Sequence, residues 1–425
     1  MGWLSAFWLT IMLMGMPIAF TLAVATLAYL FLSGTPLIII PQRMVGGIDS
    51  FPLLAVPFFI LAANLMNSAG ITDRLFTFAR VLVGRVRGGL AHVNVLASVL
   101  FSGMSGSAVA DAGGLGSMEI KAMRAAGYKP AYAAAITAAS CVIGPMIPPS
   151  IPMVIYGVLA DASIGRLFLG GVVPGLLTAG SLMAMIAITA RRRDMPMAEA
   201  MSARQSLIAT RRAALPLLTP VIIIGGILFG VFSPTEASAI ACLYALVLGL
   251  FYRELDLRRI WDVLLATART TASVCLIVAT ATVFAWLLTT LQVPQRAAAV
   301  LVGVTTDPLL LLLLISLIIF VIGFFVEGLA VMILVVPVMQ PTLAAVGIDP
   351  IHFGVILVFN LMIGLMTPPM GVGLFVVSSV SGIRVEAITR EVIPMLIPLV
   401  VVLLLLIFFP GLVTALPDFV LGPRL

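Results

Sequence analysis

Two short stretches decide how this chain folds: Phe101-Ser-Gly-Met-Ser-Gly-Ser-Ala-Val-Ala-Asp111 and Gly144-Pro-Met-Ile-Pro-Pro-Ser150. The first is small, rich in hydroxyls and flexible, and it lies inside a long apolar run. The second places a pair of prolines in the middle of another apolar run. Proline lacks a backbone donor and clashes with the preceding helical turn, so a helix must break at Pro148 and Pro149.

Both interruptions recur about half a chain later, as Gly323-Phe-Phe-Val-Glu-Gly328 and Gly364-Leu-Met-Thr-Pro-Pro-Met-Gly371. The glycine and proline-pair positions are offset by 220 residues. Val81-Leu-Val-Gly84 also recurs as Val300-Leu-Val-Gly303, with an offset of 219. Three matches at nearly one offset predict an internal repeat.

The composition surrounding these stretches excludes a soluble or disordered protein. Of the 425 residues, 62% are hydrophobic and only 9% are charged, whereas globular proteins average roughly 25% charged residues. A spanning helix needs about 20 apolar residues. The candidate segments are 3–32, 52–70, 88–118, 130–160, 166–190, 214–232, 235–252, 263–291, 308–346, 351–382 and 391–414. We expect the first segment to remain in the mature chain, because it lacks the basic start of a signal peptide.

The lengths and flanking charges of the segments predict the topology. Segments 88–118 and 308–346 are too long for one crossing and carry glycine and charge near their middles, which suits re-entrant hairpins. Clusters of Arg and Lys lie at 74–87, 121–129, 191–212, 253–269 and 384–390. All five fall on the cytoplasmic side only if the hairpins turn back, as the positive-inside rule requires. The first hairpin then opens to the cytoplasm and the second to the outside. This predicts an all-α polytopic membrane protein with inverted repeats, two re-entrant hairpins and two broken helices.

Broken helices are tolerated in a membrane where the freed backbone groups line a polar site. Carbonyl oxygens suit sodium, and helix N-termini suit an anion. We therefore predict two sodium sites, one at each hairpin tip and helix break, with an anionic substrate between them. The sodium ligands expected are Ser102, Gly103, Gly144, Ile147 and Pro149 in the first site, and Gly323, Gly364, Thr367 and Met370 in the second. The expected substrate contacts are Ser105, Ser107 and Ser150. The alternative is that these small residues only allow close helix packing.

Other isolated polar residues have both functional and structural interpretations. Glu327 and Asp111 are candidates for an ion or proton role, although Glu327 could pair with an arginine and Asp111 could cap a helix. Ser233 and Glu236 have the spacing of a capping box. We expect the histidines and cysteines to be structural, without disulfides; these residues are His92, His352, Cys141, Cys242 and Cys275.

The sequence also indicates the energy source. No GxxxxGK[ST] phosphate loop is present, so ATP hydrolysis by this chain is unsupported. An ion gradient must then drive accumulation, and an anionic cargo requires two or more cations to be carried with it. We expect sodium as the coupling ion and no other cofactor. The net charge of +6 reports membrane orientation and not nucleic-acid binding.

The stretch from Gly88 to Asp111 resembles the large membrane subunit of TRAP (tripartite ATP-independent periplasmic) transporters. Pro57-Phe-Phe-Ile-Leu-Ala-Ala-Asn-Leu-Met66 and both proline-pair motifs are also similar to that family. The resemblance implies a multi-pass protein of the bacterial inner membrane that works with a small membrane subunit and a periplasmic substrate-binding protein to import an organic acid, often a dicarboxylate. It also implies an elevator mechanism, with scaffold residues 1–87, 191–307 and 391–425 and a transport domain of residues 88–190 and 308–390.

Two other functions remain open at this stage. Gly103-Met-Ser-Gly106 fits the nucleophile pattern of intramembrane serine proteases, with His352 as a possible base. A standalone carboxylate carrier with similar hairpins is the other alternative. Retained transport after Ser105→Ala would argue against the protease, and uptake without a binding protein would indicate the standalone carrier.

Overall fold

The computed structural model describes residues 7–8, 10–12, 14–193, 195–197, 201–324, 326–368 and 371–423. Within these ranges the chain is helical, and its β-structure is one isolated bridge between Arg87 and Met197. Seven of the described helices are long and apolar enough to cross a membrane. The predicted all-α polytopic fold is therefore confirmed.

The helices of the first half run from the N-terminus to α11. They are α2 (Ile18–Ser33), α3 (Ile39–Ile48), η1 (Phe51–Leu54), α4 (Ala55–Ser68), α5 (Ile71–Val83), α6 (Gly89–Ser105), α7 (Ala108–Gly113), α8 (Leu115–Ala125), α9 (Pro130–Ser140), η2 (Cys141–Ile143), α10 (Ile151–Ala160) and α11 (Ile164–Arg192).

The second half begins with longer helices and ends with a series similar to that of the first half. They are α12 (Ala203–Leu228), α13 (Pro234–Phe251), α14 (Leu257–Thr290), α15 (Val293–Val304), α16 (Pro308–Gly323), α17 (Gly328–Val346), α18 (Pro350–Leu365), α19 (Val372–Ser381), α20 (Val385–Phe408) and α21 (Gly411–Leu421).

The order of elements shows the internal repeat. Helices α6, α9, α10 and α11 correspond to α16, α18, α19 and α20, and the paired helices start 219 to 221 residues apart. Both predicted long segments turn, α6 into α7 and α8, and α16 into α17. Both proline-pair helices break, α9 before α10 and α18 before α19. The opposite insertion of the two halves stays a prediction.

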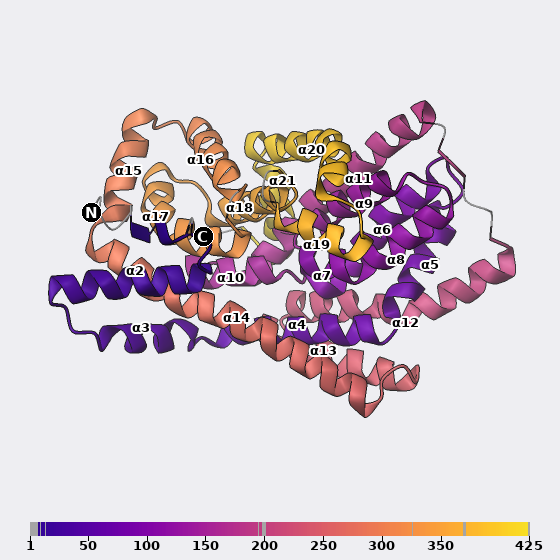
Figure 1. Cartoon of the computed structure of the whole chain (residues 1–425), viewed down its shortest axis with the longest axis horizontal. Coiled ribbons are helices and arrows are strands. Elements are labelled where there is room, and N and C mark those ends of the chain that lie inside the picture. Colours follow the sequence, from indigo (N-terminus) through magenta and orange to yellow (C-terminus); the bar gives the residue numbers. More distant parts are fainter. Residues whose placement is uncertain are drawn as a thin grey trace.

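The helices form two groups that lie against each other (Figure 1). Along one long side, α2, α3 and α4 pack against α14, and α13 packs against α4. On the other side, α9 and α11 pack against α20, and α16 packs against α18. The second arm of each hairpin contacts the far half-helix of the other repeat, α17 with α10 and α8 with α19. The two repeats are thus interlocked. The exact scaffold and transport boundaries stay a prediction.

Several predicted bounds were wrong for local reasons. Segment 3–32 is not one helix, because Gly15 adopts φ +85° and α2 begins directly after Pro17. Helix α12 begins at Ala203, eleven residues before the predicted segment, because Ser202 and Gln205 form a capping box inside the arginine-rich run. The segment expected to end at residue 414 is split near Pro410 into α20 and α21.

Candidate functional site

The tip of the first hairpin lies directly on the first helix break. The Ile151 amide donates a hydrogen bond to the Gly106 carbonyl oxygen at 3.2 Å. Gly106 has φ +60°, and a side chain there would collide with the Pro149 carbonyl oxygen. The left-handed backbone and the close approach both require glycine. The structure thus brings the first hairpin tip and the first helix break together, and the sodium site at this contact stays a prediction.

The remaining residues of this predicted site differ in what they present. Ser102 Oγ donates to the Val99 carbonyl oxygen at 2.6 Å. Gly144 lies under the carboxylate of Asp111, which leaves no room for a Cβ. The side chain of Ile147 packs against Gly175 of α11, so Ile147 could contribute to an ion site only through its carbonyl oxygen. Gly103 lies between the first helix break and α12. A Cβ placed on it would be 3.9 Å from the Pro148 carbonyl oxygen and 2.8 Å from Pro220 Cβ of α12.

The second hairpin meets the second helix break in the same manner. A Cβ on Gly364 would lie 3.1 Å from the carbonyl oxygen of Gly323. Thr367 continues the turn after α18, with its amide bonded to the Gly364 carbonyl oxygen at 3.0 Å and its Oγ1 to that of Ile363 at 2.7 Å. Three of the four predicted ligands therefore converge. The fourth, Met370, lies outside the described residues.

A cavity of about 350 Å³ lies between the two tips and helices α4 and α14; we call it the tip cavity. Its polar lining consists of Ser105, Ser107, Glu327, Asn64 and Thr270. The apolar part includes Pro145, Ile151 and Pro152 of the first break, and Met362 and Leu365 of α18. Both hairpins, both broken helices and two helices of the other group therefore line one cavity. It is the position expected for a substrate.

The hydroxyls predicted to contact substrate are not equivalent. Ser105 Oγ donates to Asp111 Oδ1, so its proton is already used. Ser107 Oγ accepts from the Ala110 amide at 3.4 Å as the cap of α7, which leaves its own proton for donation. Ser150 is buried, accepts from the Met153 amide at 3.3 Å as the cap of α10, and does not line the tip cavity.

The two carboxylates singled out in the sequence both lie near this cavity. Glu327 lines it and caps α17, with Oε2 accepting from the Ala330 amide at 3.1 Å. Asp111 is 1% exposed, and its Oδ2 has no hydrogen-bond partner among the described residues. In the described part of the chain neither carboxylate forms an ion pair. Glu327 therefore caps α17, whereas the helix-cap interpretation of Asp111 is wrong, because Ser107 caps α7 and Asp111 bonds to Ser105 from its first turn.

The remaining polar residues and cysteines have structural roles in the described part of the chain. Ser233 and Glu236 form the predicted capping box at the start of α13. His352 Nε2 lies 2.8 Å from the Leu406 carbonyl oxygen, and His92 is buried. Cys141, Cys242 and Cys275 are all free thiols. Because Ser105 bonds to Asp111 and His352 bonds to the backbone, the structure forms no Ser–His pair between these two residues.

Sequence reasoning missed two polar residues of the tip cavity, Asn64 on α4 and Thr270 on α14. The Asn64 amide donates to Thr267 Oγ1 at 3.0 Å, which joins the two helices. The signal was present, because a lone amide inside an apolar run is a functional candidate in membranes. The partner could not be read from the sequence, since it lies 203 residues away.

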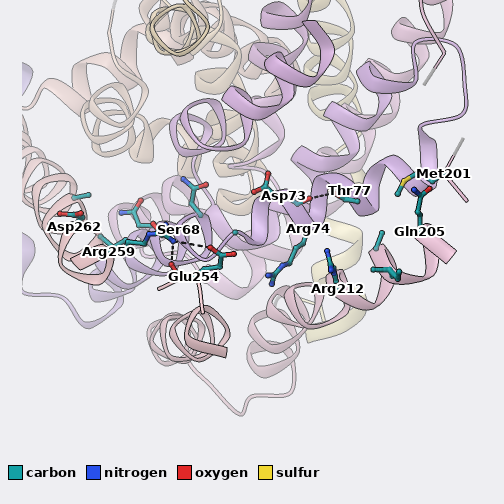
Figure 2. Close-up of a pocket in the computed structure, with 17 residues that line it drawn as sticks. Ser68, Asp73, Arg74, Thr77, Met201, Gln205, Arg212, Glu254, Arg259 and Asp262 are labelled. Carbon is teal, nitrogen blue, oxygen red and sulfur yellow. Dashed lines mark hydrogen bonds and ion pairs between the residues drawn. The ribbon is translucent and has the colours of Figure 1, made fainter. Parts of the chain in front are cut away.

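Figure 2 shows a second, larger cavity of about 890 Å³. Asn64 lines both cavities, which therefore adjoin at this residue. Its lining comes from α4, α5, α12, the loop after α13 and the start of α14. The charged residues on it are Asp73, Arg74, Arg212, Glu254, Arg259 and Asp262. Three of the five basic clusters recognised in the sequence therefore converge on this one cavity.

Comparison with known proteins gives a consistent result. Residues 6–412 match the family model of the DctM component of tripartite ATP-independent periplasmic transporters. The chain is 51% identical to the sialic acid TRAP transporter large permease protein SiaM of Vibrio cholerae, over 98% of each chain. It is 45% identical to the sialic acid TRAP transporter permease protein SiaT of Haemophilus influenzae, over 97% of this chain and 67% of that one. The fold resembles the YdaH transporter of Alcanivorax borkumensis, with a TM-score of 0.68 at 17% identity, over 93% and 90% of the two chains.

Proposed function

Because this chain belongs to the DctM-component family and is the large membrane subunit of a TRAP transporter, we propose that it imports a carboxylate-bearing organic acid in symport with sodium, by an elevator movement. The cargo is delivered by a periplasmic substrate-binding protein, and a small membrane subunit completes the complex. Sialic acid is the first cargo to test, since two relatives with high identity are named for it.

Family membership settles two simpler points. The chain is a multi-pass protein of the bacterial inner membrane, and seven described helices are suited to crossing it. It is a transporter subunit and not an enzyme, so the protease alternative raised by Gly103-Met-Ser-Gly106 is wrong.

The composition of the tip cavity is the observation that supports the transport mechanism best. Its lining includes residues of both hairpin tips and of α4 and α14. A cargo held there touches both predicted domains, so sliding one against the other would carry it across the membrane. Ser107 is suited to donate a hydrogen bond to the carboxylate of the cargo. Hydrogen bonds to charged groups are stronger than those between neutral groups.

Sodium coupling is supported by the backbone at the two tip-and-break contacts. In each contact a glycine of the hairpin lies against the broken helix, and unpaired carbonyl oxygens near a break suit a hard monovalent cation. An anionic cargo also needs accompanying cations for accumulation against an inside-negative potential, because each charge is worth about 2.3 kcal/mol per 100 mV.

The test is sialic acid uptake into proteoliposomes that contain the chain with its small subunit and its binding protein. We expect uptake with an inward sodium gradient, and none when potassium replaces sodium. Uptake that survives omission of the binding protein would indicate the standalone carrier instead. Uptake that requires ATP would contradict the proposal.

A further inference from the structure

The large cavity shown in Figure 2 is built only from elements on one side of the predicted domain division. Its lining residues fall within residues 64–77, 201–212 and 254–266, all inside the scaffold ranges 1–87 and 191–307. An elevator movement of the hairpins would leave such a cavity unchanged. We call this cavity the vestibule.

The vestibule and the tip cavity meet at one side chain. Asn64 lines both cavities, and its hydrogen bond to Thr267 joins α4 to α14 at that point. The first hairpin reaches the same region. A Cβ placed on Gly114 would lie 2.9 Å from the side-chain nitrogen Nδ2 of Asn67, and Asn67 also lines the vestibule. A cargo leaving the tip cavity toward the arginine clusters would therefore pass Asn64.

The charges of the vestibule are separated along it. Arg259 pairs with Glu254 at 3.5 Å, and Figure 2 places Asp262 at the same end as this pair. Arg74 reaches from α5 and Arg212 from α12 into the cavity away from that end.

These two arginines are not neutralised. Arg74 stacks on the Tyr252 ring, with its guanidinium carbon 3.3 Å from the ring centroid. Its buried Nη1 has no hydrogen-bond partner in the described part of the chain. Neither Arg74 nor Arg212 forms an ion pair with a described residue. In Figure 2 the neighbouring Asp73 side chain points from α5 in the direction opposite to Arg74.

We propose that the vestibule is a fixed anion-binding station on the release path, where Arg74 and Arg212 take the carboxylate of the cargo after it passes Asn64. This proposal rests on the proposed function and on the cytoplasmic placement of the arginine clusters. Two guanidinium groups present fork-shaped donors that match a carboxylate. Arg212 is exposed to water, which leaves the bound anion a route of release.

A labelling experiment tests this station without requiring transport. Ile208 lines the vestibule one helical turn before Arg212, whereas the neighbouring Leu207 is exposed but does not line it. Ile208→Cys and Leu207→Cys are placed in the full complex with Cys141, Cys242 and Cys275 replaced. Inside-out vesicles are then treated with a sulfonate-bearing thiol reagent. We expect sialic acid to slow labelling of Ile208→Cys about tenfold at saturation and to leave Leu207→Cys unchanged.

The charge variants decide whether the arginines cause this protection. The double variant Arg74→Gln/Arg212→Gln should lose the protection of Ile208→Cys by sialic acid. It should also take up sialic acid several-fold more slowly, with the half-saturating external sialic acid concentration unchanged. Arg211→Gln, on the exposed neighbour of Arg212, should do neither. Protection that persists without both arginines, or no protection in the parent, would overturn the proposal. So would protection by phosphatidylglycerol in place of sialic acid, since the occupant would then be a lipid headgroup. Failure of the parent complex to take up sialic acid would contradict the proposed function instead. The labelling experiment would still show whether the vestibule binds the anion, because it does not depend on transport.

Discussion

Ser107 and Glu327 lie 220 residues apart and occupy equivalent positions in the two repeats. Each follows a hairpin tip, and each accepts the backbone N–H three residues later, from Ala110 and Ala330 respectively. Both side chains line the tip cavity. The repeat has therefore placed a neutral hydroxyl and a carboxylate in the lining of one cavity. We expect the neutral side to hold the anionic cargo and the charged side to favour a cation.

The hydroxyls of the first tip should differ in their effect on cargo binding. Ser107→Ala removes a free donor, and a hydrogen bond to a charged group is worth about 1.5–3 kcal/mol. The half-saturating sialic acid concentration should therefore rise by roughly tenfold or more. Ser105→Ala should change it much less, because the Ser105 proton is donated to Asp111. Equal effects of the two variants in uptake assays would show that this distinction is wrong.

The carboxylate of the second tip should act on sodium. Glu327→Gln keeps the size of the side chain and its ability to cap α17 but removes a charge that no described cation neutralises. We expect the half-saturating sodium concentration for uptake to rise several-fold. The matched control is Glu236→Gln, at the capping box of α13, which does not line the tip cavity. An unchanged sodium dependence in Glu327→Gln would remove this residue from the ion pathway.

The close contact between Gly323 and Gly364 should be essential for coupling. A methyl group on Gly364 would lie 3.1 Å from the Gly323 carbonyl oxygen and must push the tip away from the break. Overpacking of this kind costs about 1–3 kcal/mol. Gly364→Ala and Thr367→Ala should lose sodium-stimulated uptake. Gly303→Ala, whose Cβ would meet open space in α15, should retain it. Gly144→Ala should fail as well, since Asp111 fills the space needed by the new methyl group.

Gly103 provides a test that separates ion binding from domain movement. Its Cβ position is 2.8 Å from Pro220 Cβ, across the contact between α6 and α12. If Gly103→Ala fails because the hairpin catches on α12, Pro220→Gly should restore part of the uptake rate. A double variant as inactive as Gly103→Ala alone would place the defect in the sodium site. Uptake rates at saturating sodium, measured for all four combinations, give the coupling between the residues.

Local signals explain which parts of the fold were predictable. The proline pair after Gly144 and the one after Gly364 each break a helix through backbone chemistry that needs no neighbour. The turn at Gly15 and Pro17 was equally local, yet it was missed because the apolar residues on both sides were taken as one segment. Ser150 and Ser107 each cap a helix, but only Ser107 lines the tip cavity, so the substrate contact of Ser150 stays a prediction that the cavity does not support.

Contacts between distant residues explain what the sequence left unseen. Asn64 meets Thr267, 203 residues later, and no periodicity in either helix indicates that contact. The vestibule likewise requires α5, α12 and α14 to meet, and in the sequence its arginines were recognised only as basic clusters on the predicted cytoplasmic side. The carboxylates were recognised, but the bond that orients Asp111 toward Ser105 depends on the turn between α6 and α7.

The central claim is that two tip-and-break units enter the membrane from opposite sides. Single cysteines at exposed ends of each hairpin test it most directly: Arg85→Cys and Ala125→Cys for the first, Thr306→Cys and Ala345→Cys for the second. With an impermeant thiol reagent on intact cells and on inside-out vesicles, we predict labelling of the first pair only from the cytoplasm and of the second pair only from the periplasm. Labelling of the two ends of one hairpin from different sides, or of all four positions from one side, would contradict the account.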